Sequence, residues 1–281
     1  MNNNFLDNFI SSALKEDIGD GDHTSLACIP PDTTGKAQLL IKEDGILAGI
    51  DLTREILLKI DPGIHFYKFI EDGTPVKEGD TAFQITGSVH SILKSERLIL
   101  NILQRMSGIA TRTRAYVDRL KGLKTRVLDT RKTTPCFRFF EKKAVVIGGG
   151  ENHRMGLFDM IIIKDNHIDF AGGIEKAILN TQQYVSKIKK DIKIEIEARS
   201  IDSVREILAV GGVDRIMLDN FTIENTREAV ELIAGRIETE SSGGIILENI
   251  RAYAECGVDY ISVGTLTHHI KSINMSLKAI Y

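Results

Sequence analysis

The sequence predicts an α/β protein in which an α+β module with a small antiparallel sheet precedes a (β/α) barrel. Between residues 35 and 93, short strand-forming stretches alternate with tight turns, which is typical of a small antiparallel sheet. After Gly122, short apolar stretches alternate with helical ones, and this pattern predicts a parallel sheet. Several predicted strands end at a polar residue or at Gly. That favours a barrel, because the functional groups of (β/α) barrels gather from many strands at the carboxyl face.

The first module should begin with a helix at about 5–18, where apolar residues recur at helical spacing. The polar stretch 17–24 is expected to be a turn, because its Asp and Gly residues lack the Glu spacing of an EF-hand calcium loop. A helix at about 51–59 interrupts the strands, and a long helix follows at about 95–120. Gly108 within that helix costs about 1 kcal/mol relative to Ala, which indicates close packing there. The expected strands are 37–42, 45–48, 65–69 and 82–87.

The second module is expected to contain short buried strands separated by helices. An open doubly wound sheet is the alternative, but it would concentrate its ligand groups at one switch point with a Gly-rich first turn. The Gly triplet 148–150 does not form the six-residue dinucleotide fingerprint, and the sequence contains no P-loop. The expected strands are 126–129, 160–164, 193–197, 215–219, a weak one near 237–240, and 260–263, and the expected helices are 173–189, 203–210, 223–233 and 247–255.

Composition and charge are those of an ordinary globular protein. The chain has 281 residues, 42% of them hydrophobic and 27% charged, so it can bury a sizeable core. A net charge of −3 argues against general binding to nucleic acids or membrane surfaces, and no apolar run is long enough to cross a bilayer. Cys28, Cys136 and Cys256 form no C-x-x-C pair, which argues against a disulfide framework or a structural zinc site. Because the N-terminus lacks a secretory leader pattern, a cytoplasmic compartment is expected.

A dense group of cationic side chains lies between residues 126 and 164. Turn formers and short polar residues surround them, whereas a solvated helix face would show regular Glu–Lys alternation. Because the whole chain is slightly acidic, this positive charge is local and suits a pocket for a small, highly anionic ligand. An exposed basic loop is the alternative. The cations are Arg126, Arg131, Lys132, Arg138, Lys142, Lys143, Arg154 and Lys164.

Acidic and phosphate-binding residues are expected at the predicted strand ends. Glu195 and Glu197 alternate with isoleucines, so both should face one side of their strand, where they could coordinate a metal or face a transient cation. An ordinary half-exposed strand charge is the alternative for Glu195. Asp219 ends an apolar strand, with a helix N-cap as the alternative. Ser242–Gly244 precedes a helix expected to start near Leu247, and bare N–H groups at a helix start can cradle a phosphate. A plain turn is the alternative there.

Two histidines adjoin the cations. His153, next to Arg154, is expected to donate hydrogen bonds to an anion. His153 and His167 lie too far apart, and outside any His-Glu-x-x-His helix, to suggest a zinc pair. Together the cations, the acids and the phosphate cradle fit a reaction in which polyphosphate leaves, with help from Mg²⁺, and positive charge develops on a sugar carbon. The same residues could serve a sugar-phosphate aldolase or isomerase, so they leave the reaction open.

The chain resembles the quinolinate phosphoribosyltransferase family, the carboxylating nicotinate-nucleotide pyrophosphorylases of de novo NAD synthesis. The resemblance implies an N-terminal α/β sandwich domain over 1–112, to which 270–281 can add final strand elements, and an incomplete (β/α) barrel over 113–270. Two positions depart from the family pattern: Cys136 stands where Gly is usual, and Lys143 where an aromatic residue is usual. The matching segments are 96–97, 100–101, 107–111, 129–135, 141–145, 148–157, 163–167, 194–197, 217–221, 242–245 and 262–267.

The resemblance also implies an activity and the residues that perform it. Quinolinate and phosphoribosyl pyrophosphate would react with the help of Mg²⁺ to give nicotinate mononucleotide, pyrophosphate and CO₂, in a homodimer whose Arg97 reaches the neighbouring subunit's active site. Lys132, Lys164, Glu197 and Asp219 are the expected catalytic residues. Arg131, Lys132, His153 and Arg154 would grip the pyridine dicarboxylate, Lys164 would contact phosphate or carboxylate, Glu197 and Asp219 would hold ribose hydroxyls and Mg²⁺, and Ser242, Gly243, Gly244 and Gly264 would bind the 5′-phosphate.

Three other functions stay open on the sequence. The first is a related phosphoribosyltransferase that takes nicotinate or another base. The second is a barrel lyase or isomerase for sugar phosphates, in which Lys164 would form a Schiff base. The third is a non-catalytic regulator that binds phosphate.

Overall fold

The structure, a computed structural model, describes residues 3–280. The chain divides into two compact units. The first unit consists of the residues up to Arg112, the segment Phe139–Gly148 and the residues from Ile270 on. The second unit consists of Thr113–Arg138 and Gly149–His269. Within residues 3–280, every helix is too short or too polar to traverse a bilayer.

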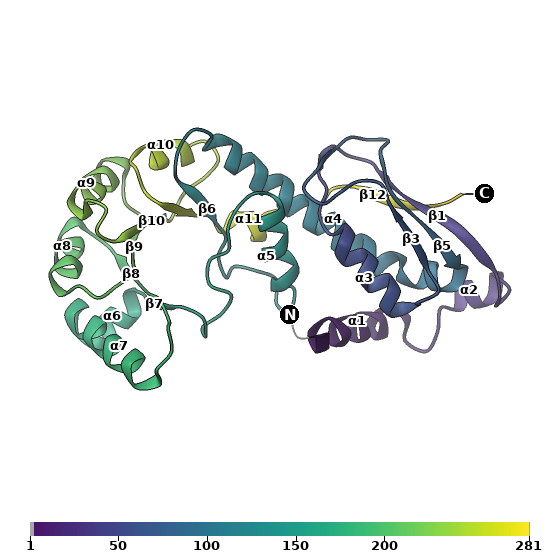
Figure 1. Cartoon of the computed structure of the whole chain (residues 1–281), viewed down its shortest axis with the longest axis horizontal. Coiled ribbons are helices and arrows are strands. Elements are labelled where there is room, and N and C mark those ends of the chain that lie inside the picture. The colour runs from purple at the N-terminus through teal and green to yellow at the C-terminus, as the bar shows by residue number, and fades with distance from the viewer. Residues whose placement is uncertain (1–2, 281) are drawn as a thin grey trace. The chain divides into compact units, whose positions relative to one another are not determined.

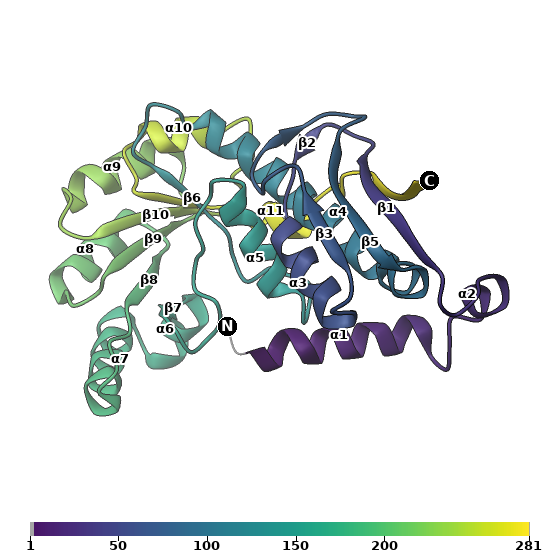
Figure 2. The ribbon, with the colours of Figure 1, turned by 45° about the vertical axis from the view of Figure 1, so that its right-hand side comes forward.

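The first unit is built on a four-stranded antiparallel sheet with helices beside it (Figures 1 and 2). The strand order is β12-β1-β5-β3, so the last strand of the chain pairs with the first. The strands of this sheet are β1 (Thr34–Ile41), β3 (His65–Lys68), β5 (Thr81–Ser88) and β12 (Met275–Ile280), and β2 (Gly45–Ile46) pairs separately with β4 (Pro75–Val76). The helices are α1 (Asn3–Ile18), α2 (His23–Cys28), α3 (Ile50–Ile60), α4 (Val89–Arg119), which continues into the second unit, and α5 (Arg138–Ile147).

Close backbone contacts hold α4 in the first unit. The N–H group of Ala48 donates to the hydroxyl of Ser107 at 3.0 Å. A Cβ atom at Gly108 would lie well inside 3.0 Å of the carbonyl oxygen of Lys271. The close packing that the sequence indicated at Gly108 is therefore confirmed, because the backbone before β12 approaches the helix where a side chain would block it.

Helix α2 occupies residues that were partly expected to form a turn. The helix begins at His23, inside the polar stretch 17–24. Asp22 caps it, because its Oδ1 accepts a hydrogen bond from the N–H of Ser25 at 3.1 Å. The acidic side chain thus has a capping role, which is a common reason for Asp before a short helix.

Helix α5 belongs to the first unit, although the sequence assigned residues 113–270 to the barrel. Its aromatic residues pack against α1. The ring centroids of Phe139 and Phe5 are 5.7 Å apart, and those of Phe140 and Phe9 are 4.6 Å apart. This aromatic cluster buries Phe140 completely and explains why the segment leaves the barrel.

The second unit is a six-stranded parallel sheet with helices along its outer side (Figures 1 and 2). The strand order is β6-β11-β10-β9-β8-β7, so β6 and β7 stand at opposite ends and the barrel is incomplete, as predicted. The strands are β6 (Arg126–Leu128), β7 (Ile161–Ile163), β8 (Ile194–Ala198), β9 (Arg215–Asp219), β10 (Glu238–Ser242) and β11 (Tyr260–Ser262). The helices are α6 (Asp165–Ala171), α7 (Ile174–Ile188), α8 (Ile201–Val210), α9 (Ile223–Ile233), α10 (Ile250–Glu255) and α11 (Thr265–His268).

Polar caps start the helices that follow β8 and β9. The side chain of Ser200 accepts the N–H of Ser203 at 3.1 Å, and that of Thr222 accepts the N–H of Asn225 at 3.2 Å. These caps satisfy N–H groups that have no partner inside the helix. Each of these two strands therefore ends a few residues before its helix begins, which leaves a short loop at the carboxyl end of the sheet.

Candidate active site

A cavity of about 700 Å³ opens at the carboxyl ends of the strands in the second unit. Parallel strands place their carboxyl ends at one edge, so residues far apart in the sequence meet there. All expected site residues except Arg97 and Gly264 line this cavity. Its lining is Thr130, Arg131, Lys132, His153, Arg154, Ile162, Lys164, Asp165, Glu197, Met217, Asp219, Asn220, Glu240, Ser242, Gly243, Gly244 and Ser262.

The cations of the cavity stand on loops. Arg131 and Lys132 follow β6, and the hydroxyl of Thr267 donates to the Lys132 carbonyl at 2.8 Å, which anchors that loop. The Nη1 group of Arg154 donates to the carbonyl of Met160 at 2.9 Å. Burial, and then the neighbouring guanidinium of Arg131, lower the pKa of Arg154. Clustered positive charge of this kind creates a field that favours an anionic ligand.

Lys164 follows β7 and forms an ion pair with Oε1 of Glu197 on the next strand. The other oxygen, Oε2, accepts the N–H of Asp165 at 3.1 Å. Glu197 is nearly buried, whereas the Lys164 side chain is 44% exposed, so the lysine is the accessible partner. His167 does not point to a metal here, since its Nδ1 accepts the N–H of Lys164 at 2.9 Å and helps to begin α6.

Asp219 ends β9 beside Glu197. Burial, and then the negative charge of Glu197, raise the pKa of Asp219. Nδ2 of Asn220 donates to Oδ2 of Asp219 at 2.8 Å and steadies the carboxylate. The alternative of a helix N-cap is wrong, because Thr222 caps the following helix. The carboxylates of Glu197 and Asp219 thus lie on adjacent strands at the carboxyl end of the sheet.

The Ser-Gly-Gly segment lines the same cavity. Gly243 and Gly244 have φ values of +89° and +61°, in the left-handed region that favours glycine. The helix that follows starts at Ile250, three residues later than expected, and the two glycines form a turn before it. Phosphate binding by this segment stays a prediction. The hydroxyl of Ser262 donates to that of Ser242 at 3.2 Å, which ties the turn to β11. Gly264 lies outside the lining, but a Cβ there would come within 2.9 Å of Cδ of Lys132.

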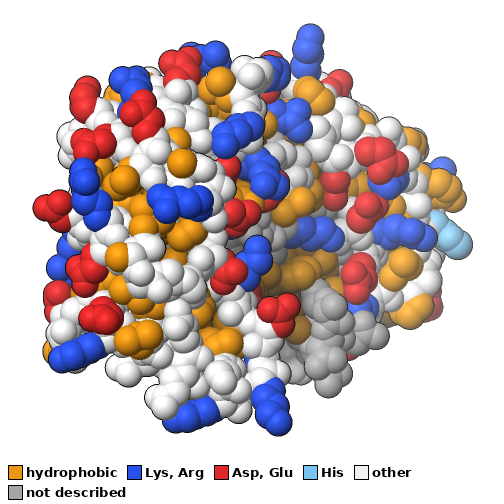
Figure 3. Space-filling view, turned by 60° about the vertical axis from the view of Figure 1, so that its left-hand side comes forward, with side chains coloured by type: hydrophobic (Ala, Val, Ile, Leu, Met, Phe, Trp, Pro, Cys, Tyr) orange, Lys and Arg blue, Asp and Glu red, His pale blue; other side chains and the backbone are white. Residues whose placement is uncertain are grey.

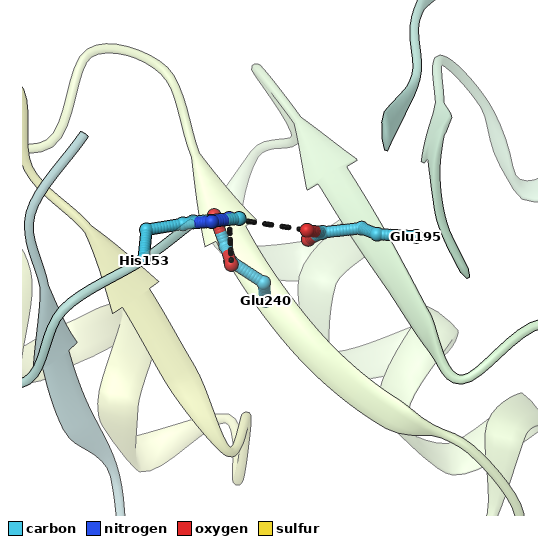
Figure 4. A group of neighbouring side chains, drawn as sticks. All are labelled: His153, Glu195 and Glu240. Atoms are coloured by element: carbon cyan, nitrogen blue, oxygen red, sulfur yellow. Dashed lines mark ion pairs between the residues drawn. The ribbon is translucent and has the colours of Figure 1, made fainter. Parts of the chain in front are cut away.

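A buried ion cluster forms the floor of the cavity (Figure 4). Nε2 of His153 lies 3.1 Å from Oε2 of Glu195 and 3.2 Å from Oε2 of Glu240. Glu195 is completely buried, so the alternative of a half-exposed strand charge is wrong. Arg215 completes the cluster, with Nη1 3.2 Å from Oε2 of Glu240. The sequence did not predict Glu240 or Arg215 as site residues.

Protonation in this cluster is shared. Burial by itself lowers the pKa of His153, but the adjacent carboxylates outweigh it and raise the pKa to about 9. Burial, and then the charge of Glu240, raise the pKa of Glu195 to about 7. Burial also opposes the ionised form of Glu240, yet its contacts with His153, Ser262 and Arg215 outweigh this and lower the pKa of Glu240. The cluster therefore retains one proton near neutral pH, and this proton lies between Nε2 of the imidazole and the Glu195 carboxylate, because Nδ1 accepts the N–H of Arg154.

Two expected site features lie elsewhere. Arg97 is exposed on α4, in the first unit, and its contact with a neighbouring subunit stays a prediction. Cys136, where the family usually has Gly, has a φ of +61°, so this position still adopts the backbone that Gly favours. Lys143 lies on α5 in the first unit and lines no part of the cavity.

Figure 3 shows Lys and Arg side chains interspersed with Asp and Glu over one face of the molecule, not gathered by sign.

Among the described residues, the group whose side chains could hold a metal by themselves is His153, Glu195 and Glu240. Within residues 3–280, Glu197 and Asp219 do not form such a group with a third protein ligand. A metal at these two carboxylates would need further ligands from a substrate or from water.

Comparison with known proteins gives one consistent result. The quinolinate phosphoribosyl transferase family matches in both of its domains, the N-terminal domain at residues 22–107 and the C-terminal domain at residues 109–278. The decarboxylating quinolinate phosphoribosyltransferase 1b of Nicotiana tabacum is 45% identical, over 97% of this chain and 82% of its own. A probable carboxylating nicotinate-nucleotide pyrophosphorylase of Bacillus subtilis is 39% identical, over 99% of this chain and 94% of its own. The crystal structure of NadC from Streptococcus pyogenes is 40% identical, with a TM-score of 0.92 over 98% of this chain and 97% of its own.

Proposed function

The chain belongs to the quinolinate phosphoribosyltransferase family, and we propose that it joins quinolinate to phosphoribosyl pyrophosphate, releasing nicotinate mononucleotide, pyrophosphate and CO₂. The observation that carries this proposal is the cavity itself. Cations on loops face carboxylates at the ends of adjacent strands, so one site can hold a diacid and a sugar donor together.

The diacid end of the site consists of Arg131, Lys132 and Arg154, with His153 on the floor. Guanidinium groups bind carboxylates through two parallel N–H bonds, which fixes the plane of the pyridine ring as well as its position. A ring held in this way directs its nitrogen at one point. That orientation converts a reaction between two molecules into one within a complex, which is a large part of the rate enhancement.

The sugar end consists of Glu197 and Asp219. Carboxylates stabilise the positive charge that develops on the anomeric carbon when the leaving group departs. Lys164, the accessible partner of Glu197, can then neutralise phosphate or carboxylate charge. Ser242, Gly243 and Gly244 offer a hydroxyl and backbone groups for the 5′-phosphate at the next strand end.

Decarboxylation becomes possible once the ring nitrogen has formed its bond to the anomeric carbon. The ring nitrogen attacks the anomeric carbon as pyrophosphate leaves, and the nitrogen becomes positively charged. The bond to the adjacent carboxylate then breaks, its electron pair remains on the ring carbon beside the cationic nitrogen, and a proton takes the place of CO₂. Arg131 and Arg154 hold the diacid throughout, and a site that excludes water protects the intermediate.

Mg²⁺ belongs to the proposal. The ion commonly binds through one or two carboxylates together with substrate phosphates, and Glu197 and Asp219 are oxygen ligands of that kind on adjacent strands. Both oxygens of Glu197 already have protein partners, so Asp219 is the more available ligand and the donor would supply the rest. When bound, the ion would neutralise negative charge on the departing pyrophosphate.

We further propose a cytoplasmic homodimer in which Arg97 serves the partner's cavity. Support comes from its exposed position on α4, in the unit that does not contain the cavity. Mixing two inactive variants, Arg97→Ala and Asp219→Asn, tests this. If Arg97 acts across subunits, mixed dimers regain one intact site and about a quarter of wild-type activity returns. If no activity returns after subunit exchange, Arg97 acts within its own subunit or not at all.

The decisive test is turnover by the purified protein with quinolinate, phosphoribosyl pyrophosphate and Mg²⁺. Nicotinate mononucleotide, pyrophosphate and CO₂ should appear in equal amounts. Release of pyrophosphate with nicotinate, without CO₂, would instead identify a transferase for the monoacid. Borohydride trapping of Lys164 on a sugar phosphate would identify a Schiff-base enzyme. Unchanged turnover by Arg131→Ala would show that the cations do not bind the substrate.

A further inference from the structure

The floor of the cavity connects the ligand-binding surface with the interior of the barrel. His153 and Glu240 line the cavity, whereas Glu195 lies behind them and contributes nothing to the lining. Figure 4 shows the carboxylates of Glu195 and Glu240 approaching the same end of the imidazole, at Nε2, from two different strands. Both carboxylates are completely buried. Glu195 therefore meets a ligand through His153 and not directly.

His153 transmits its orientation to Arg154. Nδ1 of the imidazole accepts the N–H of Arg154 at 2.7 Å, and the N–H of His153 donates to Oδ1 of Asp129 at 2.8 Å. Because Nδ1 is an acceptor, the ring proton stands on Nε2, which faces the two carboxylates. A rotation of the ring would break the bond at Nδ1 and release the backbone of Arg154, whose guanidinium is already held at Met160.

Stability does not account for Glu195. A carboxylate that is fully removed from water is destabilising unless hydrogen bonds and charges compensate it. Among the described residues, the two oxygens of Glu195 accept no hydrogen bond in good geometry, and His153 is the ion-pair partner. An uncharged side chain of the same shape should fold at least as well. What this charge provides is an electrostatic attraction that holds the Nε2 end of the imidazole 3.1 Å from Glu195.

A divalent cation is the other occupant that these side chains suggest, since their ligand atoms lie within 4.8 Å of one another. Arg215 argues against it. Its Nη1 lies 3.2 Å from Oε2 of Glu240, so a dication would face a guanidinium across the same carboxylate. Arg215 neutralises Glu240 and leaves His153 as the group that Glu195 orients.

We propose that Glu195 is a positioning residue for the diacid substrate: it fixes the imidazole of His153 and, through Nδ1, the backbone that carries Arg154. The inference rests on the proposed function, because it takes Arg154 as a ligand of the quinolinate carboxylates. It assigns a role to a residue that touches no substrate. A displacement of Arg154 by about an ångström is enough to weaken a bidentate contact by one to two orders of magnitude.

Glu195→Gln tests the proposal, with Glu238→Gln as the matched control. Glu238 also pairs with Arg215, but it is partly exposed at the opposite end of β10. Binding of quinolinate by calorimetry needs no turnover. We expect Glu195→Gln to bind quinolinate about ten- to a hundredfold more weakly, with KM for phosphoribosyl pyrophosphate and the thermal midpoint unchanged or improved. Glu238→Gln should bind quinolinate as the wild type does.

The outcomes separate the two proposals. If the wild-type protein does not bind quinolinate, the proposed function is wrong. If the wild type binds quinolinate and Glu195→Gln binds it equally well, the positioning role is wrong, and equal weakening of both substrates would show a merely structural role. ¹⁵N NMR gives an independent reading, because Nδ1 of His153 should show the shift of an unprotonated acceptor in the wild type and lose it in the variant. If the Gln variant fails to fold, Glu195→Asp, which keeps the charge but shortens its reach, should weaken quinolinate binding alone.

Discussion

Gly243→Ala and Gly244→Ala form a matched pair that tests the turn at the sugar end of the cavity. Both glycines have positive φ, +89° and +61°, so each substitution places Ala in the left-handed region. Their surroundings differ. A Cβ at Gly243 would lie 2.6 Å from Cγ and 3.0 Å from the backbone nitrogen of Asn220, whereas a Cβ at Gly244 meets nothing within 4 Å.

The magnitudes follow from these contacts. Ala in the left-handed region costs about 1–2 kcal/mol, and a stiffer unfolded chain returns about 0.4–1 kcal/mol. Gly244→Ala should therefore lower the free energy of unfolding by about 0–1.6 kcal/mol. Gly243→Ala must also push the Asn220 side chain away from Asp219, which costs about 1–3 kcal/mol for overpacking. We expect it to be less stable than Gly244→Ala by about 1–3 kcal/mol.

Urea unfolding of both variants measures this difference, and steady-state kinetics measures its effect on function. Because Asn220 donates to Asp219 at 2.8 Å, its displacement frees the carboxylate that we assign to the sugar donor. KM for phosphoribosyl pyrophosphate should rise in Gly243→Ala, with KM for quinolinate little changed. Equal stability of the two variants would refute the role given to the Asn220 contact.

Three further predictions concern other parts of the chain. Gly108→Ala should lower the free energy of unfolding by about 2 kcal/mol despite the better helix propensity of Ala, because its Cβ collides with the Lys271 carbonyl; an unchanged urea midpoint would contradict this. The pKa of Glu195, raised by burial and by Glu240 to about 7, means that the ionised carboxylate is disfavoured in the folded chain, so stability is complete below the unfolded value of 4.5 and declines as the pH rises through about 7. The free energy of unfolding should therefore fall between pH 4.5 and 7, and the Glu195→Gln variant should show a flatter profile over that range. Lys164→Met should abolish turnover and lower the free energy of unfolding by about 1–3 kcal/mol, because it removes the charged partner of buried Glu197; the double variant with Glu197→Gln should recover stability but not turnover.

The parallel strands could be predicted because short apolar runs in this chain end at turn-forming or charged residues. The run before Asp219 is an example, and β9 ends at that residue. Short helices were harder to predict. Helix α5 carries Lys142 and Lys143 among its apolar residues, so its charge concealed the helical spacing of Phe140, Ala144 and Val145. Its place in the first unit depends on aromatic contacts with α1, which are distant in sequence and leave no local signal.

The site could be predicted as far as the strand ends and no further. Glu197 and Asp219 were visible because each follows an apolar stretch. Glu240 was not, because β10 is the polar sequence Glu-Thr-Glu-Ser-Ser, so the weak strand expected near 237–240 has no apolar stretch that ends at an acid. Alternation along that strand places Glu240 and Ser242 on one face, and the register with β9 sets Ser242 beside Asp219. That alternation was the signal available in the sequence, but its partners are defined only by the sheet.

The pairing of charges in the cavity couples the two ends of the proposed reaction. Within the protein Lys164 is paired with Glu197, whose charge already raises the pKa of Asp219. An anion that takes Lys164 therefore leaves the Glu197 carboxylate uncompensated beside a second carboxylate, and their repulsion grows in the low dielectric of the cavity. A positive charge between them relieves it, whether it is a divalent ion or the sugar carbon as its leaving group departs. Binding the anionic group at Lys164 thus strengthens the stabilisation of the cation at Glu197 and Asp219, so that the same lysine acts on both sides of the bond that breaks.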